Sequence, residues 1–142
     1  MTRVYVDMVA DLFHAGHVEF LRRAREFGDE LAVGIHSDET VAGYKRATVM
    51  TMDERIPVVA ACRYVDEVIP DAPLVVSREW IDEHRIDLVV HGDDLAEEML
   101  MLMYRAPHEL GILRLVPYTA GISTSELIER VRRLPAGDAP SS

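Results

Sequence analysis

The sequence predicts an α/β fold in which a doubly wound parallel sheet of about five strands carries helices on both faces. Apolar runs rich in β-branched residues alternate with helical stretches at short intervals along the chain. Such alternation produces parallel strands joined by crossover helices, which then cover the two faces of the sheet. Most polar motifs of this chain follow a predicted strand, and ligands bind at that edge in Rossmann-like folds.

Five strands and five helices are predicted. The strands are expected at Val4–Val9, Glu30–His36, Val65–Ile69, Asp87–His91 and Gly111–Val116. The helices are expected at about 17–27, 52–62, 77–84, 95–109 and 124–134. Two of these helices open with a capping-box pattern, a hydroxyl residue followed three positions later by Glu: Thr51-Met52-Asp53-Glu54 and Ser123-Thr124-Ser125-Glu126.

Length and composition indicate one domain. The chain has 142 residues, of which 49% are hydrophobic, so it can bury a core of its own. We expect this domain to span residues 1–134 and to be followed by a disordered tail over 135–142. The apolar run Met99–Tyr104 lacks clean amphipathic spacing, and we interpret it as core or as a subunit contact.

Charge and cysteine content narrow the class of function. A formal net charge of −10 and an isoelectric point near 4.9 argue against nucleic acid or an anionic membrane surface as the main partner. The single Cys62 excludes an intramolecular disulfide, and no signal-like or long apolar stretch is found. We therefore expect a reducing, cytoplasmic setting. No spacing of His and Cys suggests a zinc site.

The most informative motif is His14-Ala15-Gly16-His17, which follows the first predicted strand. Its two imidazoles would lie near a helix N-terminus, where unpaired N–H groups and the helix dipole favour anions. Imidazoles donate hydrogen bonds while neutral and add charge when protonated, so the motif is typical of a site that stabilises departing pyrophosphate. The alternative is that one histidine caps the helix and the other is buried. At this spacing we favour phosphate binding.

Polar clusters follow three further strands. Lys45 and Arg46 would supply mobile positive charge to a transition state, or they are two solvated surface cations. The turn His91-Gly92-Asp93-Asp94 would contact a base or ribose or help to hold magnesium, with a plain acidic turn as the alternative. The segment Thr119–Glu126 would form a second anion site, unless its hydroxyls serve only as a helix cap.

These segments together resemble the cytidylyltransferase family, which includes glycerol-3-phosphate, phosphocholine and phosphoethanolamine cytidylyltransferases. The similarity runs from about residue 3 to residue 133, and the segments that carry it are Asp11–His17, Arg63–Val68, Glu83–Asp87, His91–Asp94 and Gly121–Ser125. The HxGH element is shared with adenylyltransferases of the wider superfamily and indicates only the reaction type. The Arg63–Val68 run and the GIST turn are more specific to the cytidylyl branch.

The resemblance implies roles for individual residues. His14 and His17 would contact the triphosphate and stabilise the leaving pyrophosphate, and Lys45 would bridge the phosphates of nucleotide and acceptor. The nucleotide-binding residues that it implies are Val9, Ala10, Asp11, Gly16, His91, Gly92, Asp94, Thr119, Gly121, Ile122, Ser123 and Thr124. It also implies magnesium, held mainly through the nucleotide phosphates and not by a dedicated protein site, and a homodimer with Arg63–Asp66 close to the interface.

The chain departs from the family pattern around this site. Tyr118-Thr119-Ala120 stands where the family usually has arginine, threonine and glutamate, and Met8 and Ala10 stand where it usually has glycine and phenylalanine. Arg114 is no easy substitute for the missing arginine, because four residues of strand place it about 13 Å away. We therefore hypothesise a non-standard acceptor, such as a phosphonate or an unusual phosphorylated alcohol. The small number of aromatic residues disfavours phosphocholine.

The predicted function is transfer of CMP from CTP to a small phosphorylated alcohol or phosphonate, with release of pyrophosphate. One alternative is an adenylyltransferase that uses ATP on a similar acceptor. Another is a nucleotide-binding regulatory module without catalysis, which the departures near Thr119 would fit. The presence of both motif histidines, Lys45 and the GIST turn favours the enzyme, because a sensor has no need to stabilise a leaving group.

Overall fold

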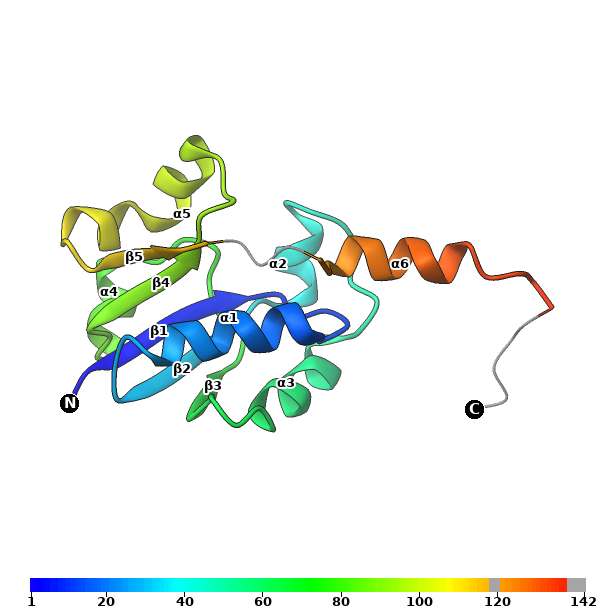
Figure 1. Ribbon diagram of the computed structural model, residues 1–142. Coiled ribbons are helices and arrows are strands. Elements are labelled where there is room, and N and C mark those ends of the chain that lie inside the picture. Colours follow the sequence, from blue (N-terminus) through cyan, green and yellow to red (C-terminus); the bar gives the residue numbers. More distant parts are fainter. Residues whose placement is uncertain (118–120, 138–142) are drawn as a thin grey trace.

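A computed structural model describes residues 1–117 and 121–137, and it contains one five-stranded sheet that is parallel throughout (Figure 1). The strands, in the spatial order β3-β2-β1-β4-β5, are β1 (Arg3–Met8), β2 (Glu30–Ile35), β3 (Glu67–Ile69), β4 (Leu88–Gly92) and β5 (Leu113–Val116). The helices are α1 (Ala15–Arg25), α2 (Asp38–Ala42), α3 (Met52–Ala60), α4 (Arg78–Glu83), α5 (Glu97–Glu109) and α6 (Thr124–Arg132).

The predicted fold class is confirmed. Each predicted strand and helix is present with its ends shifted by a few residues, and α2 is a short helix that the sequence analysis did not predict. Tyr118, Thr119, Ala120 and the end of the expected tail, 138–142, lie outside the described residues.

Two apolar layers lie on the two faces of the sheet. Val4 and Val6 of β1 pack with α1 and α3 on one face, whereas Tyr5 packs with α4 and α5 on the other. Successive side chains of a strand point to opposite faces, so a central strand covered on both sides must be apolar along its whole length. All three of these side chains are fully buried. Helices on both faces are therefore confirmed (Figure 1).

The strand order creates a crevice at one edge of the sheet. The chain runs outward from β1 to β2 and β3, and then returns to place β4 on the other side of β1. The helices that follow neighbouring strands diverge at such a switch point, and the carboxyl ends of β1 and β4 open between them. The loops after these two strands, residues 9–14 and 93–96, consequently meet at the same edge.

The turn between β1 and α1 contains two left-handed residues that are not glycine. Ala10 has a φ of 59° and Leu12 a φ of 50°. Backbone of this kind is unfavourable for residues with a Cβ and is concentrated at functional sites. Ala10 is also buried against the core, which limits this position to a small side chain.

α5 is kinked where its apolar run ends. Pro107 has no N–H to donate to the Met103 carbonyl, and the backbone N–H of Val76 donates to that carbonyl instead, at 2.8 Å. Tyr104 has non-helical backbone angles at the kink. Met103 and Tyr104 are both buried, as expected for core residues, but both also line the pocket described below, where no ligand contact was expected.

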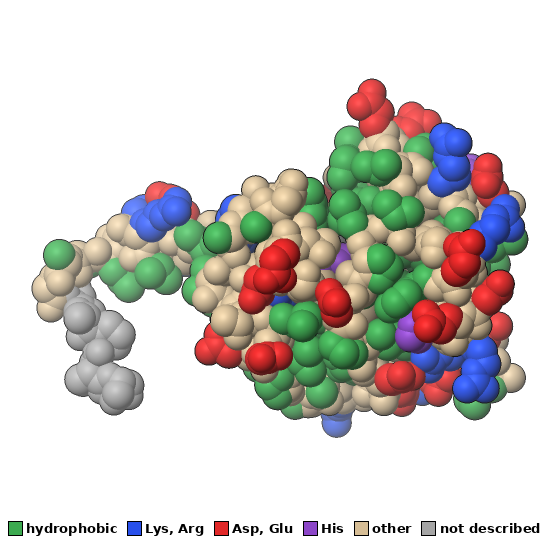
Figure 2. Space-filling model, turned by 180° about the vertical axis from the view of Figure 1, so that it is seen from behind, with side chains coloured by type: hydrophobic (Ala, Val, Ile, Leu, Met, Phe, Trp, Pro, Cys, Tyr) green, Lys and Arg blue, Asp and Glu red, His purple; other side chains and the backbone are tan. Residues whose placement is uncertain are grey.

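α6 projects away from the body of the molecule (Figure 1). None of its residues is buried, with Val131 65% exposed, and hydrophobic side chains lie along one side of the helix (Figure 2). The Ser123 hydroxyl caps it by accepting the Glu126 N–H at 3.1 Å, and the reciprocal capping box predicted at Thr51 and Glu54 is confirmed at the start of α3. In the described part of the chain, no helix combines the length and apolar character that crossing a membrane requires.

Candidate active site

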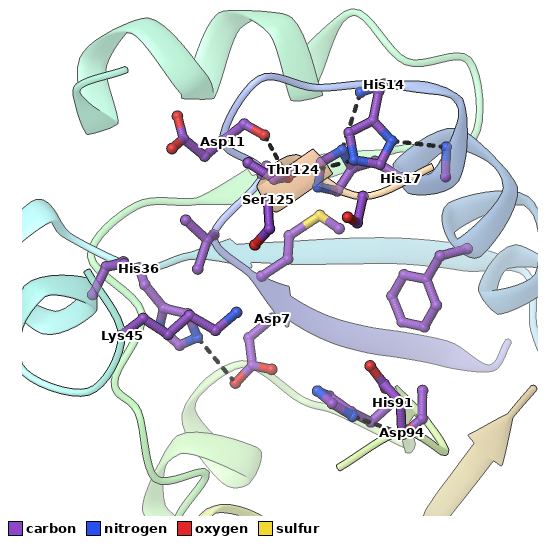
Figure 3. A pocket seen from close by; sticks show the side chains of 18 of the residues that line it. Asp7, Asp11, His14, His17, His36, Lys45, His91, Asp94, Thr124 and Ser125 are labelled. Atoms are coloured by element: carbon purple, nitrogen blue, oxygen red, sulfur yellow. Dashed lines mark hydrogen bonds and ion pairs between the residues drawn. The ribbon is translucent and has the colours of Figure 1, made fainter. Parts of the chain in front are cut away.

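A pocket of about 710 Å³ lies at the carboxyl ends of β1 and β4 (Figure 3). It brings together thirteen of the predicted site residues: Val9, Ala10, Asp11, His14, Gly16, His17, Lys45, His91, Gly92, Asp94, Ile122, Ser123 and Thr124. Gly121 is not among the lining residues, but its φ of 107° makes the turn that leads Ile122 into the pocket. Segments far apart in the sequence therefore form one site.

The pocket wall also contains residues that were not predicted as site residues, and four of them have ionisable side chains of interest: Asp7, His36, Tyr44 and Tyr104. Asp7 had a detectable signal, because a carboxylate inside an apolar strand is expensive to bury and rarely lacks a function. Tyr104 had no such signal, since it lies in an apolar stretch of α5 and far from Asp7 in the sequence.

The two motif histidines cap α1 with their own ring nitrogens. The Gly16 N–H donates to Nδ1 of His14, and the His14 N–H donates to Nδ1 of His17, each at 3.0 Å. A ring nitrogen that accepts an N–H bond carries no proton, so the proton of each neutral ring lies on Nε2. The capping alternative and the phosphate-binding prediction are therefore compatible, because both rings cap the helix and both line the pocket.

The GIST turn contacts the HxGH element through Thr124. Its hydroxyl donates to the Asp11 carbonyl at 3.1 Å and lies 3.4 Å from Nε2 of His14. Since the hydroxyl proton is used by Asp11, the Thr124 oxygen accepts from the Nε2–H of His14. A methyl group at Gly16 would lie 2.8 Å from Cε1 of His14, so this position needs glycine to leave the ring in place.

Both histidine rings are neutral near pH 7. Burial lowers the pKa of His17 to about 4, and the charges of His14 and Lys45 act in the same direction. Burial also lowers the pKa of His14. His17 therefore presents a neutral Nε2–H donor to an anion, whereas the Nε2–H of His14 is directed at the Thr124 oxygen and would be shared with, or turned to, a bound phosphate.

Lys45 and Arg46 have different surroundings, although they are neighbours. Lys45 points into the pocket, where burial lowers its pKa, and its Nζ lies 5.8 Å from the centre of the Tyr44 ring (Figure 3). Arg46 pairs with the buried carboxylate of Asp11 at 3.2 Å. Of the two alternatives stated for this pair, Lys45 fits the phosphate-binding one, whereas Arg46 serves as an ion-pair partner.

Asp11 is part of the pocket wall, but its carboxylate faces the chain. It accepts the N–H groups of Val49 and Met50, each at 2.9 Å. Burial by itself would raise the pKa of Asp11. The hydrogen bonds from Val49 and Met50 and the charge of Arg46 have a larger effect, so the pKa of Asp11 lies below its ordinary value. Because the carboxylate is already bonded, Asp11 would contact a nucleotide through its backbone.

Asp7, His36 and Tyr104 form a buried cluster at the end of the pocket away from the motif histidines, and we call this cluster the acid end. The Tyr104 hydroxyl donates to Oδ1 of Asp7, whereas the buried Oδ2 has no hydrogen-bond partner and lies 3.9 Å from Nε2 of His36. Nδ1 of His36 lies 3.0 Å from the Ala72 carbonyl and donates to it, so Nε2 is the nitrogen that faces Asp7 and is the acceptor of the ring when it holds one proton. Burial raises the pKa of Asp7, against the influence of His36 and Tyr104.

The segment Arg63–Asp66, which is expected near a dimer interface, is bound to other parts of its own chain through Asp66. Asp66 accepts the Leu31 N–H at 2.8 Å and pairs with Arg25 at 3.3 Å. Arg63 and Tyr64 are partly exposed or exposed in the single chain. A homodimer at this surface stays a prediction.

We expect His17→Gln to flatten the pH dependence of stability. Because the pKa of His17 is about 4 when folded and 6.5 in the reference state, the unfolded chain binds more protons between these values. The free energy of unfolding of the wild type should therefore fall as the pH drops from 6.5 to 4, and the variant should lose part of that fall. Gln retains an acceptor for the His14 N–H. Urea unfolding at several pH values measures this, and an identical slope in both proteins would refute the low pKa.

Several known proteins are similar to this chain over most of its length. A cytidylyltransferase-like family model matches residues 8–130. Ethanolamine-phosphate cytidylyltransferase of Arabidopsis thaliana is 48% identical over 135 residues, which cover 90% of this chain and 32% of that protein. The Dictyostelium discoideum protein of the same name is 43% identical over 133 residues, covering 90% and 37%. Human choline-phosphate cytidylyltransferase A is 42% identical over 134 residues, covering 92% and 36%.

Solved structures agree on the fold. The lipopolysaccharide core biosynthesis protein from Thermoplasma volcanium is similar with a TM-score of 0.68 at 24% identity, covering 86% of this chain and 99% of that one. Pantothenate synthetase from Thermus thermophilus is similar with a TM-score of 0.61 at 13% identity, covering 89% and 61%. The chain spans 32% to 37% of the length of the three curated relatives named above. The match over residues 8–130 shows that the chain belongs to the cytidylyltransferase-like family.

Proposed function

We propose that this protein transfers CMP from CTP to a small phosphorylated alcohol or phosphonate and releases pyrophosphate. The observation that carries the proposal is the meeting of three groups in one pocket: the Nε2–H donors of His14 and His17, the ammonium of Lys45 and the turn at Ser123 and Thr124. The names of the cytidylyltransferase relatives support CTP as the nucleotide and a phosphoalcohol as the acceptor.

The reaction is an in-line displacement at the α-phosphorus. An oxygen of the acceptor phosphate or phosphonate forms the new bond, and the bond to the bridging oxygen breaks, so that pyrophosphate leaves with the electron pair. The acceptor is already ionised near neutral pH, and no strong general base is required. Catalysis then depends on holding the two reactants in line and on stabilising the charge that grows on the leaving group.

The motif histidines supply that stabilisation as neutral donors. Nδ1 of His17 accepts the N–H of the N-cap residue His14, and Nδ1 of His14 accepts the N–H of Gly16 in the first turn of α1, which polarises each ring and strengthens its Nε2–H as a donor. Protonation of either Nδ1 would break one of these backbone bonds. Lys45 lines the pocket from a different segment of the chain, and its ammonium would contact the phosphate groups of both nucleotide and acceptor.

The acid end of the pocket favours an acceptor with a primary amine. Oδ2 of Asp7 and Nε2 of His36 are two acceptors that lie 3.9 Å apart on the pocket wall. A primary ammonium has three N–H donors and can satisfy both, whereas a trimethylammonium has none. We therefore propose an aminoalkyl phosphate or phosphonate, such as phosphoethanolamine or 2-aminoethylphosphonate. The second compound would also fit the non-standard acceptor hypothesised from Tyr118 and Ala120.

Magnesium would be carried mainly by the triphosphate. In residues 1–117 and 121–137, no group of three His, Cys, Asp or Glu side chains is arranged to hold a metal ion. Of the carboxylates that line the pocket, Asp7 is bonded to Tyr104 and Asp11 to the backbone of residues 49 and 50. Asp94 would therefore be the one to contact the ion, directly or through water. The ion would neutralise phosphate charge.

We expect pyrophosphate release from CTP, and not from ATP, with an aminoalkyl phosphate present. His14→Ala and His17→Ala should each lower kcat by about 10²–10³-fold, with a smaller change in the KM for CTP, because the lost donors act on the leaving group. His108→Ala, an exposed histidine on α5, is the matched control. Faster release from ATP would identify an adenylyltransferase, and CTP binding without turnover over a broad acceptor panel would identify a regulatory module.

The pH profile tests the neutral-donor mechanism. We expect kcat to stay level from about pH 6.5 to pH 8.5, because the rings donate while neutral and deprotonation of an imidazolium is not part of the cycle. On the acid side kcat should fall as the rings and the acceptor become protonated. Initial rates at saturating substrates measure this. Activity lost on the alkaline side with a midpoint near the ordinary histidine pKa would contradict the mechanism.

Acceptor preference tests the acid end of the pocket. Phosphoethanolamine and 2-aminoethylphosphonate should be used with kcat/KM at least about tenfold higher than phosphocholine or glycerol 3-phosphate, because only their amine satisfies both acceptors. Asp7→Asn retains an acceptor for Tyr104 but removes the charge, and it should erase most of this preference. An unchanged preference in Asp7→Asn would show that the amine binds elsewhere.

A further inference from the structure

The side chain of Arg55, near the middle of α3, is fully buried with a relative exposure of 0%. A buried guanidinium is unfavourable unless its N–H groups are paired and its charge is compensated. An arginine in such a position therefore marks a place where the fold requires several hydrogen bonds from one group.

Two of these bonds reach the ends of the central strands. Nη1 of Arg55 donates to the carbonyl of Val9 at 2.6 Å and to the carbonyl of His36 at 2.9 Å. Val9 follows β1 and His36 follows β2. Arg55 thus fixes the backbone that leads into the motif turn and the backbone that presents the imidazole of the acid end.

The other two bonds reach the segment 37–51, which carries Lys45. Nη2 donates to Oδ1 of Asp38 at 2.7 Å, near the start of the segment, and Nε donates to the Met50 carbonyl at 3.1 Å, near its end. One planar group therefore joins both ends of this segment to the sheet.

Asp11 holds the same segment from the pocket side. Its side chain is 1% exposed, and it accepts the N–H groups of Val49 and Met50 and an N–H of Arg46. The residue next to Lys45 and the stretch that follows it are consequently tied to the β1–α1 turn, while Arg55 ties both ends of the segment to the sheet.

We propose that Arg55 is a positioning residue for the CMP transfer proposed above, and that it acts by fixing the backbone from which Lys45 reaches the phosphates. Lysine has a long flexible side chain, so the position of its ammonium depends on where its backbone is held. Arginine is required because its five N–H groups lie in one rigid plane and can serve four acceptors, whereas lysine has three donors on a single atom.

Arg55→Lys is the first test, because it keeps the buried charge but cannot reach all four acceptors. We expect kcat to fall about tenfold or more, with little change in the KM for CTP, since small misplacements of a catalytic group cost rate. Arg22→Lys, on the surface of α1 in ion pairs with Glu19 and Glu26, is the matched control and should retain wild-type kcat.

A double-mutant cycle separates positioning from general destabilisation. If Arg55 acts through Lys45, Arg55→Lys should lower kcat by less than about threefold in a Lys45→Ala background. Equal fractional losses in both backgrounds would overturn the proposal. Asp38→Asn replaces the charged partner of Arg55 with a neutral amide acceptor at a half-exposed position, which weakens this bond. If Arg55→Lys does not fold, Asp38→Asn should give the same non-additive pattern with a smaller loss, and additivity there would also overturn it.

Native-state trypsin cleavage gives a readout that needs no activity. Trypsin cuts after Lys45 and Arg46. At a temperature at which all three proteins are folded, it should cut this segment several times faster in Arg55→Lys than in wild type or Arg22→Lys. Unchanged cleavage would refute the anchoring. Faster cleavage in a protein that shows no CTP turnover would refute the proposed function and leave the anchoring intact.

Discussion

The amide–imidazole hydrogen bonds at the start of α1 are the constraint on which this site depends. N-terminal amides of a helix usually donate directly to an anion, but here the amides of His14 and Gly16 donate to ring nitrogens. Each ring passes the polarisation on and presents its own N–H farther out, at Nε2. The helix dipole then acts on the ligand through two imidazoles, with the reach of a side chain and the fixed direction of a backbone group.

This arrangement resolves a conflict between local and overall charge. The chain carries a formal net charge of −10, and acidic side chains are spread over the face shown in Figure 2, so its overall field opposes a triphosphate. Inside the pocket the balance differs, because Asp11 is compensated by Arg46 and two backbone amides. Neutral donors and Lys45 can therefore dominate locally, and magnesium carried by the nucleotide would reduce the remaining mismatch.

Features set by residues close together in the sequence could be predicted, whereas contacts that depend on how the strands align could not. The strands, the helix starts and the HxGH element follow from periodicity and from residues within a few positions of one another. The pairing of Asp7 with His36 depends on the parallel register of β1 and β2, in which Met8 lies beside Ile35. The four acceptors of Arg55 come from three separate segments. No local pattern encodes such contacts, which is why the phosphate end was predicted and the acid end was missed.

The two ends of the pocket place different demands on the segment between them. The donors of the phosphate end are set by the N-terminus of one helix with support from Thr124, whereas the acid end combines residues of β1, α5 and the end of β2. Lys45 lies on a segment that Arg55 joins to the residues following β1 and β2. In the proposed reaction the Lys45 ammonium contacts both the acceptor phosphate and the leaving pyrophosphate. A fixed backbone favours this role, because a shift of Lys45 toward one of these groups would weaken its contact with the other.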